Sequence, residues 1–378
     1  MTENIYLDHA ATTPVHPDVA EALAAIYQKG PHGNPSSIHG AGRAAKKIVD
    51  QARQVIARSI GAKADEIIFT SGGTESDNTA IISAAEKMQD YGKHIISTKI
   101  EHAAVLEPLK YLENRGFDVT YIDVDQDGQI DLKLMEKAIR SDTILVSAML
   151  VNNEVGSILP IAGIAELIKD RNILLHTDAV QAYGKIPIDV NELGVDYLSV
   201  SAHKINGPKG IGFLYERHGH DLKPYMHGGS QERERRGGTH NVPGSYGMQK
   251  AVELFAGHLG ERQQYLQDLK NYFITELQKS GIDFQINGTL NDSAPHIVNI
   301  YFPGQKAEQA LIRLDLEGVS VSTSSACSAG VAKPSHVLEA MYGSDSPRLN
   351  GSLRFSFGLG NTSEQIDAVV AKICQIMI

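Results

Sequence analysis

The sequence predicts an α/β fold in which helices cover both faces of a mostly parallel sheet, followed by a smaller α+β domain. Between about residues 60 and 215, short apolar runs alternate with longer amphipathic segments, as in strand–helix–strand units. After Asn241 the pattern changes to a long helical stretch and then to short alternating strands and helices. A length of 378 residues also exceeds one typical domain.

The individual elements follow from the spacing of apolar residues. In the first part, strands are predicted at residues 66–70, 94–97, 119–123, 143–147, 173–176 and 195–200, and helices at 75–88, 104–114, 132–139 and 161–169. In the second part, a helical stretch over 241–280 is broken near 257–260, and strands at 297–302, 319–322 and 352–356 precede a final helix from residue 363. We expect a large domain of residues 15–256 and a small domain of residues 1–14 with 257–378.

Composition excludes several classes of protein. The net charge of −10, from 35 basic and 45 acidic residues, argues against a general binder of nucleic acid or anionic membranes. Two cysteines are too few for a disulfide framework and suit a reducing cytoplasm. The first residues have no basic region followed by an apolar one, and no apolar run approaches 18 residues, so we expect neither a signal peptide nor a membrane span.

Two strand ends carry groups that suit one cofactor. Lys204 follows the apolar run at 195–200, and Asp178 follows the run at 173–176. Lysine amines form Schiff bases with carbonyl compounds when burial or a cationic neighbour lowers their pKa. A lysine facing an aldehyde and an aspartate facing a pyridinium nitrogen are the two anchors that pyridoxal 5'-phosphate (PLP) needs. Taken alone, Lys204 could equally be a surface lysine in a turn.

A third requirement, a phosphate site, is met by the segment Thr70-Ser-Gly-Gly-Thr-Glu-Ser-Asp77, which joins a strand to a helix. Gly73 allows close backbone approach, the helix start offers free amides, and Thr74 adds a hydroxyl. In isolation the same segment describes a plain capped turn. Ser201 and His203, beside Lys204, could complete the site.

Two further residues could contact the ring of such a cofactor. His102 follows a strand and could lie flat against an aromatic ring, and Gln181 could donate to the phenolic oxygen of the cofactor. Their alternatives are a core histidine and a helix-surface glutamine. The histidines show no His-Glu-x-x-His pattern and the cysteines no Cys-x-x-Cys pattern, so we expect no intrinsic metal site.

The two cysteines have contrasting surroundings. Cys327 lies in a run of small polar residues after a strand, which favours an exposed, reactive thiol on a mobile loop. Cys374 lies on an apolar helix face, which favours a core position. A PLP site with a thiol on a mobile loop suggests attack by Cys327 on something generated at the cofactor.

The chain closely resembles the cysteine desulfurases of the class V aminotransferase superfamily, the NifS/IscS-like group, over essentially its whole length. An ordered series of motifs carries the resemblance: Tyr6-Leu-Asp-His-Ala-Ala-Thr-Thr-Pro14, Gly33-Asn-Pro-Ser-Ser37, residues 70–78, Glu101-His102, Val151-Asn-Asn-Glu-Val-Gly156, Thr177-Asp-Ala-Val-Gln181, Ser201-Ala-His-Lys204, Gly207-Pro-Lys-Gly210, Arg236-Gly-Gly-Thr239, Ser325-Ala-Cys327 and Leu353-Arg-Phe-Ser356.

The resemblance implies a fold-type-I PLP-dependent transferase that is a homodimer. It implies PLP bound as a Schiff base to Lys204, with phosphate contacts from Thr74, Ser201, His203 and, across the dimer, Thr239. It further implies ring contacts from Asp178, Gln181 and His102, and a substrate carboxylate bound by Arg354 with help from Asn153. The chain departs from the family at Ala202, where glycine is usual, in lacking a glycine between the serines before Cys327, and in ending without a longer C-terminal tail.

The resulting hypothesis is that the protein converts L-cysteine to L-alanine and leaves a persulfide on Cys327. An acceptor protein, either an iron–sulfur scaffold or a tRNA-thiolating enzyme, then takes the sulfur, and Cys327 could transiently ligate a cluster with a scaffold. Three alternatives stay open: a selenocysteine lyase, a transaminase of the same superfamily that would not need Cys327, and a non-enzymatic platform for partner proteins.

Overall fold

The computed structural model describes residues 4–323, 327–328, 331–332 and 334–377. Its largest sheet has the strand order β2-β8-β7-β6-β5-β3-β4. These strands are β2 (Ile67–Thr70), β3 (His94–Thr98), β4 (Asp118–Ile122), β5 (Thr143–Ser147), β6 (Leu174–Asp178), β7 (Tyr197–Ser201) and β8 (Gly212–Glu216). From β4 to β7 all neighbours are parallel, whereas β8 is antiparallel to both β2 and β7. The predicted mostly parallel sheet is therefore confirmed, and β8 is the strand that the sequence analysis missed.

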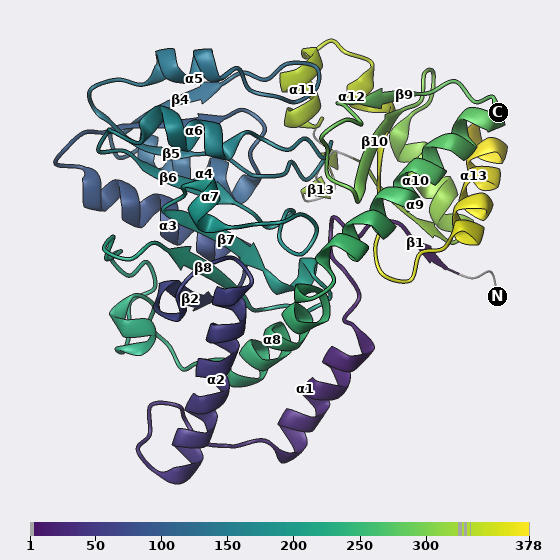
Figure 1. Ribbon diagram of the computed structural model, residues 1–378. Helices are drawn as coiled ribbons and strands as arrows, with labels where there is room; N and C mark the ends of the chain where they lie inside the picture. The colour runs from purple at the N-terminus through teal and green to yellow at the C-terminus, as the bar shows by residue number, and fades with distance from the viewer. Residues whose placement is uncertain (1–3, 324–326, 329–330, 333, 378) are drawn as a thin grey trace.

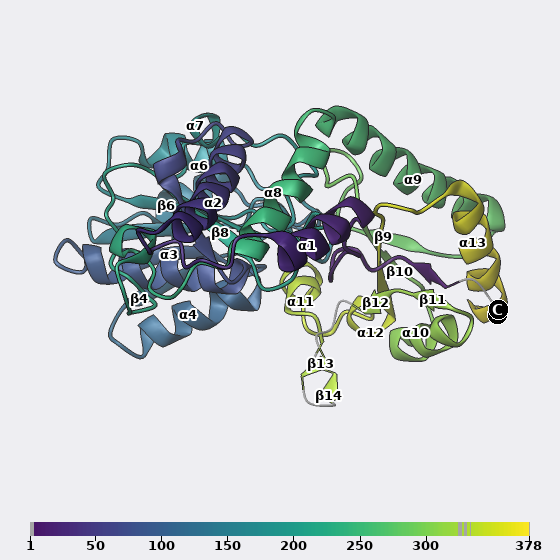
Figure 2. The same cartoon turned by 90° about the horizontal axis from the view of Figure 1, so that it is seen from below.

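Helices lie on both faces of this sheet. α3 (Gly73–Met88) and α4 (Ala103–Glu113) cover one face, and α6 (Ile161–Ile168) and α7 (Val190–Leu193) lie on the other (Figure 2). α5 (Leu132–Ala138) contacts α6. Because both faces are covered, every residue of β3, β5, β6 and β7 is buried. Burial on two sides explains why these strands read as continuous apolar runs instead of alternating patterns.

Three helices form a separate group beside the sheet, at the bottom of Figure 1. α8 (Val242–Ala256) packs against both α1 (Pro17–Lys29) and α2 (Gly40–Arg58). The predicted helical stretch after Asn241 is present as α8 and α9 (Leu259–Ser280), and it is interrupted between Ala256 and Leu259, as expected. No element was predicted before residue 60, so α1 and α2 were not expected from the sequence.

A second, antiparallel sheet has the order β12-β15-β10-β9. Its strands are β9 (Gln285–Asn287), β10 (Ile297–Tyr301), β12 (Ser322–Thr323) and β15 (Ser352–Ser356), and α9, α10 (Ala307–Leu316) and α13 (Ser363–Met377) pack around it. Its core includes Phe273, whose ring lies 4.8 Å from that of Phe355 and 5.6 Å from that of Phe357 between centroids. This sheet and its helices form the smaller group on the right of Figure 1.

The N-terminal segment belongs to the smaller group. β1 (Ile5–Tyr6) pairs in parallel with β11 (Val319–Ser320), and Ile5 and Leu7 are buried in the same core as Phe273. This pairing supports our proposed division into residues 15–256 and residues 1–14 with 257–378. The remaining elements are the 3₁₀ turns η1 (Ala64–Glu66), η2 (Ala202–Lys204) and η3 (Gln231–Glu234), the strands β13 (Cys327–Ser328) and β14 (Val331–Ala332), and the helices α11 (His336–Tyr342) and α12 (Arg348–Gly351). Over the described ranges, no helix has the length and apolar character needed to cross a membrane.

Candidate active site

A cavity of about 740 Å³ lies between the region of the seven-stranded sheet, which contributes residues such as Asp178, and the smaller group, which contributes Arg354. Most of the site residues expected from the sequence line it: Gly73, Thr74, His102, Asn153, Asp178, Gln181, Ser201, His203, Lys204 and Arg354. Asp178 and Ser201 are the last residues of the parallel neighbours β6 and β7. The cavity therefore lies at the carboxyl ends of these strands, where parallel sheets commonly bind ligands.

Lys204 stands in the turn η2, directly after β7. Its Nζ donates to the backbone oxygen of Ala10 and, at 2.8 Å, to that of Ala11. Burial and the nearby Arg354 cation lower the pKa of the Lys204 amine to about 8, while Asp178 and Asp8 act in the opposite direction. Because an amine is nucleophilic only when neutral, this lysine is suited to bind a carbonyl compound near neutral pH.

Asp178 is buried at the end of β6, where one carboxylate oxygen accepts the amide of Val180 at 2.8 Å. Burial and the neighbouring Asp77 raise the pKa of the Asp178 carboxyl to about 7, against the effects of His102 and His176. A cationic N–H placed against this carboxyl would favour its ionised form. A protonated ring nitrogen is a group of that kind.

The turn before α3 supplies an anion site. α3 begins at Gly73, and the first amides of a helix have no carbonyl within the helix to bind. A Cβ at Gly73 would lie 2.7 Å from a methyl carbon of Val180, so glycine is required there. A Cβ built on Gly72 would lie 3.4 Å from the Ser201 hydroxyl oxygen, so Ser201 is close to the turn. The same cavity is lined by Thr74 and His203.

His102 is the N-cap residue of α4. Its Nδ1 accepts the amide of Ala104 at 3.1 Å, so the proton of the neutral ring lies on Nε2. Burial lowers the pKa of His102, and Lys204 and His336 lower it further, while Asp178 raises it. Nε2 is therefore the ring atom that is available for hydrogen bonding or proton exchange in the cavity.

Gln181 and Arg354 both contact the N-terminal segment. The side-chain amide of Gln181 donates to the oxygen of Ala10 at 2.8 Å. Arg354, on β15, donates to the backbone oxygen of Asn153 at 2.8 Å and to the carboxylate of Asp8 at 2.8 Å. A guanidinium of this kind can bind a carboxylate ligand with two parallel hydrogen bonds.

Several residues of the site were missed by the sequence analysis. Asp8, with the backbone oxygens of Ala10 and Ala11, contacts the two cationic side chains of the cavity. Glu101 is buried beside His102, and burial raises the pKa of its carboxyl to about 8. His336 also lines the cavity, and its Nε2 donates to the backbone oxygen of Glu101 at 2.9 Å. The motifs Tyr6–Pro14 and Glu101-His102 contained Asp8, Ala10, Ala11 and Glu101 but indicated no role for them, and no motif contained His336.

Two expected residues are not among the described residues that line the cavity. Thr239 is exposed and is not among the described residues that line it. Cys327 belongs to β13, which pairs with β14, and its side chain lies outside the described part of the structure. Within the described residues, no group of three or more His, Cys, Asp or Glu side chains is arranged to hold a metal ion.

A family model, "Aminotransferase class-V", matches residues 5–369. The chain belongs to this family. It is similar to the IscS 1 protein of Bacillus subtilis, with 51% identity over 99% of both chains. It is also similar to the "Cysteine desulfurase IscS" of Dictyoglomus turgidum, with 48% identity over 97% of this chain and 93% of the relative. A solved structure titled "NIFS-LIKE PROTEIN" matches with a TM-score of 0.92 and 39% identity over 99% of both chains.

The expected resemblance to class V aminotransferases of the NifS/IscS-like group is thus confirmed, as is the α/β fold. The family comprises PLP-dependent enzymes. The cavity of this chain combines the Lys204 amine, whose pKa is lowered, the buried Asp178 carboxyl group, the N-terminus of α3 and Arg354. These groups suit a ligand that carries an aldehyde, a basic ring nitrogen and a phosphate, together with an amino-acid carboxylate.

Proposed function

We propose that this protein is a cysteine desulfurase. It removes the sulfur atom of L-cysteine, so that cysteine and the thiol of Cys327 become L-alanine and a Cys327 persulfide. The observation that carries the proposal is the meeting of Lys204, Asp178 and Arg354 in one cavity of a class V aminotransferase fold. The names of relatives that align over nearly the whole chain support the same activity.

The cofactor of the proposed reaction is PLP, which when bound supplies a protonated ring that accepts electron density from the substrate. Lys204 would hold its aldehyde carbon and Asp178 its ring nitrogen. The phosphate would be bound by the start of α3 at Gly73 and Thr74 together with Ser201 and His203. Gln181 would donate to the phenolic oxygen, and His102 would cover the ring.

Side chains of the protein bind the substrate and move protons in the proposed reaction. Arg354 binds the substrate carboxylate, with Asn153 beside it, and must exchange its present contact with Asp8 to do so. The Lys204 amine, with a pKa of about 8, is able to remove a proton from the substrate carbon and return it near neutral pH. His102 exchanges protons through Nε2, because Nδ1 already accepts the amide of Ala104.

The partners of the reaction are part of the same proposal. The protein acts as a homodimer in which Thr239 of one copy completes the phosphate site of the other. A cytoplasmic acceptor protein, an iron–sulfur scaffold or a tRNA-thiolating enzyme, collects the sulfur, without direct nucleic-acid or membrane binding by this chain.

The test is to incubate the PLP-loaded protein with L-cysteine and to measure alanine together with the mass of the peptide that contains Cys327. We expect stoichiometric alanine and one additional sulfur atom on that peptide. Turnover that continues unchanged in Cys327→Ala would favour a transaminase instead. A rate on selenocysteine far above that on cysteine would favour a selenocysteine lyase, and failure to bind PLP would favour a platform protein.

A further inference from the structure

Residues 231–240, which contain η3 and end just after Thr239, have an unusual backbone. The consecutive residues Glu232, Arg233 and Glu234 have left-handed φ angles of 46°, 57° and 68°. Residues with side chains rarely adopt this conformation, and it persists only where surrounding contacts impose it. Arg235, the next residue, donates to the Glu216 carboxylate at 2.9 Å and to the backbone oxygen of Asp65 at 2.8 Å, and further contacts are made by the Glu232 carboxylate.

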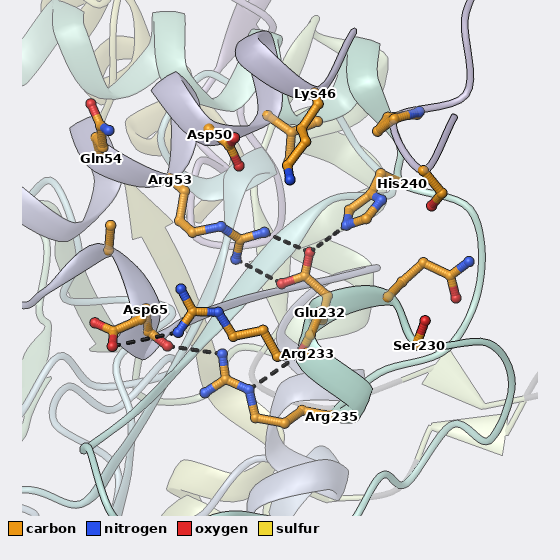
Figure 3. A pocket seen from close by; sticks show the side chains of 15 residues that line it. Lys46, Asp50, Arg53, Gln54, Asp65, Ser230, Glu232, Arg233, Arg235 and His240 are labelled. Atoms are coloured by element: carbon orange, nitrogen blue, oxygen red, sulfur yellow. Dashed lines mark hydrogen bonds and ion pairs between the residues drawn. The ribbon is translucent and has the colours of Figure 1, made fainter. Parts of the chain in front are cut away.

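Glu232 is a buried carboxylate with basic partners on two sides. Arg53, from α2, donates to both of its oxygens at 2.7 Å, and His240 Nε2 lies 3.1 Å from one of them (Figure 3). The amide of Phe69 on β2 donates to it as well, at 3.0 Å. Hydrogen bonds and the Arg53 charge hold the pKa of Glu232 at about 2 despite its burial, so it stays ionised. Both ends of the Glu232–His240 stretch are thus fixed to one carboxylate.

The same segment is joined to the phosphate turn of its own chain. Arg236 donates to the two carboxylate oxygens of Glu75 at 2.7 and 3.1 Å, and Glu75 accepts the amide of Ser71 at 2.7 Å. Glu75 is in the first turn of α3, whose amides form the expected phosphate site. The segment is therefore fixed on one side by Glu232 and on the other by the turn that holds the phosphate.

Thr239 lies in the chain between Arg236, which binds Glu75, and His240, which binds Glu232. It is exposed, and in the described chain it is absent from the lining of the cavity that contains Lys204. A hydroxyl that is held on a rigid, exposed loop, away from its own site, is placed to reach another molecule.

We propose that Glu232 is a positioning residue for the active site of the second copy: by imposing the left-handed backbone of residues 232–234, it presents Thr239 to the phosphate bound by the partner. The proposal rests on the proposed function, in which the protein is a PLP-binding homodimer. It adds that loss of the Glu232 carboxylate weakens cofactor binding in the other subunit and leaves the subunit that carries the substitution unaffected.

The experiment uses full-length heterodimers purified through two different tags, with one Lys204→Ala chain so that only one site can link PLP covalently. When Glu232→Gln is on the Lys204→Ala chain, the competent site receives Thr239 from the altered chain, and we expect the apparent Kd for PLP to rise about tenfold, the effect of one lost hydrogen bond to a charged group. When Glu232→Gln is on the other chain, we expect the wild-type Kd. The readout is the absorbance of PLP bound through Lys204, without any turnover.

Three controls make the result specific. Thr239→Val should reproduce the effect in the same arrangement, and adding Glu232→Gln to that chain should weaken binding no further. Arg53→Lys, which keeps the charge but loses the paired hydrogen bonds, should give a smaller effect in the same direction even if Glu232→Gln does not fold. Asp196→Asn, which removes a carboxylate bound to the amide of Leu175 at 2.8 Å and to His220 at 2.8 Å, should change stability without changing the Kd in either arrangement.

The opposite pattern, with weakening only when Glu232→Gln and the intact Lys204 share a chain, would overturn the proposal, because Glu232 would then act on its own site. A protein that sediments as a monomer while binding PLP and producing alanine would also overturn it and leave the desulfurase function standing. Wild-type protein that fails to bind PLP would contradict the proposed function itself.

Discussion

The guanidinium of Arg354 donates a 2.8 Å hydrogen bond to the carboxylate of Asp8, 346 residues earlier in the chain. Arg354 is buried, and its second hydrogen bond goes to the backbone oxygen of Asn153. The group expected to bind the substrate carboxylate therefore already has a carboxylate partner within the protein. Asp8 both orients Arg354 and competes with the ligand.

Replacing Asp8 with asparagine should separate these two effects. The asparagine oxygen can still accept the bond from Arg354, whereas the negative charge is lost. We expect KM for L-cysteine to fall about two- to fivefold, the range for removing one partly screened charge near the ligand, with little change in kcat. Steady-state kinetics measure both values. A raised KM would mean that orientation of Arg354 by the charge outweighs competition.

Lys204 should react with PLP in a pH-dependent manner. Its pKa of about 8 means that the neutral, reactive amine increases about tenfold per pH unit up to pH 8 and then reaches a plateau. The rate at which cofactor-free protein acquires PLP absorbance should follow this curve, whereas an ordinary lysine would level off near pH 10. Since Asp8 raises this pKa, Asp8→Asn should move the plateau to lower pH.

Borohydride reduction should place the adduct on Lys204, and Lys204→Ala should form no adduct and no alanine.

Asp178→Asn should leave the fold intact and lower turnover by at least ~100-fold, the effect of removing one electrostatic group at an active site. The amide can still accept the backbone bond from Val180, but it cannot keep a ring nitrogen protonated. Steady-state alanine production measures the loss, and circular dichroism checks the fold. Unchanged kinetics would mean that the ring nitrogen has another partner.

The sequence predicted those parts of the site that are local in the chain. Asp178 and Ser201–Lys204 follow apolar runs, and strand–helix alternation brings such strand ends to one edge of a sheet. The contacts of Lys204 with Ala10 and Ala11 join residues 193 or more positions apart. No periodicity reports such contacts, because they depend on β1 pairing with β11 in the smaller group. Asp8 was missed as a partner of Arg354 for the same reason.

The two cysteines should differ in function. Cys327→Ser should bind L-cysteine and yield almost no alanine or sulfide, because its thiol is the proposed acceptor of sulfur. Cys374, on α13, is half-buried against the core of the smaller group, so Cys374→Ser should keep normal turnover with a modest loss of stability. Alanine assays and thermal unfolding of both variants test this contrast. Normal turnover in Cys327→Ser, or additional sulfur on Cys374, would contradict sulfur transfer through Cys327.

Glu101 should make the stability of the cofactor-free protein depend on pH. Its carboxyl is fully buried, and burial raises its pKa from 4.5 to about 8, although the Thr98 hydroxyl and the Met149 amide donate to it. Because the folded state holds this proton more tightly than the unfolded state, the stability that it contributes is full below pH 4.5 and is lost as the pH rises through about 8.

Glu101→Gln removes the ionisation and keeps an oxygen for both donors. The Tm of this variant should therefore match the wild type near pH 4 and exceed it by a growing margin at pH 5, 7 and 9, as measured by thermal unfolding of cofactor-free protein. Glu107→Gln on the neighbouring α4, where the side chain is 66% exposed, is the matched control and should show no such trend. A difference in Tm that stays constant from pH 5 to pH 9 would show that Glu101 remains in one protonation state throughout.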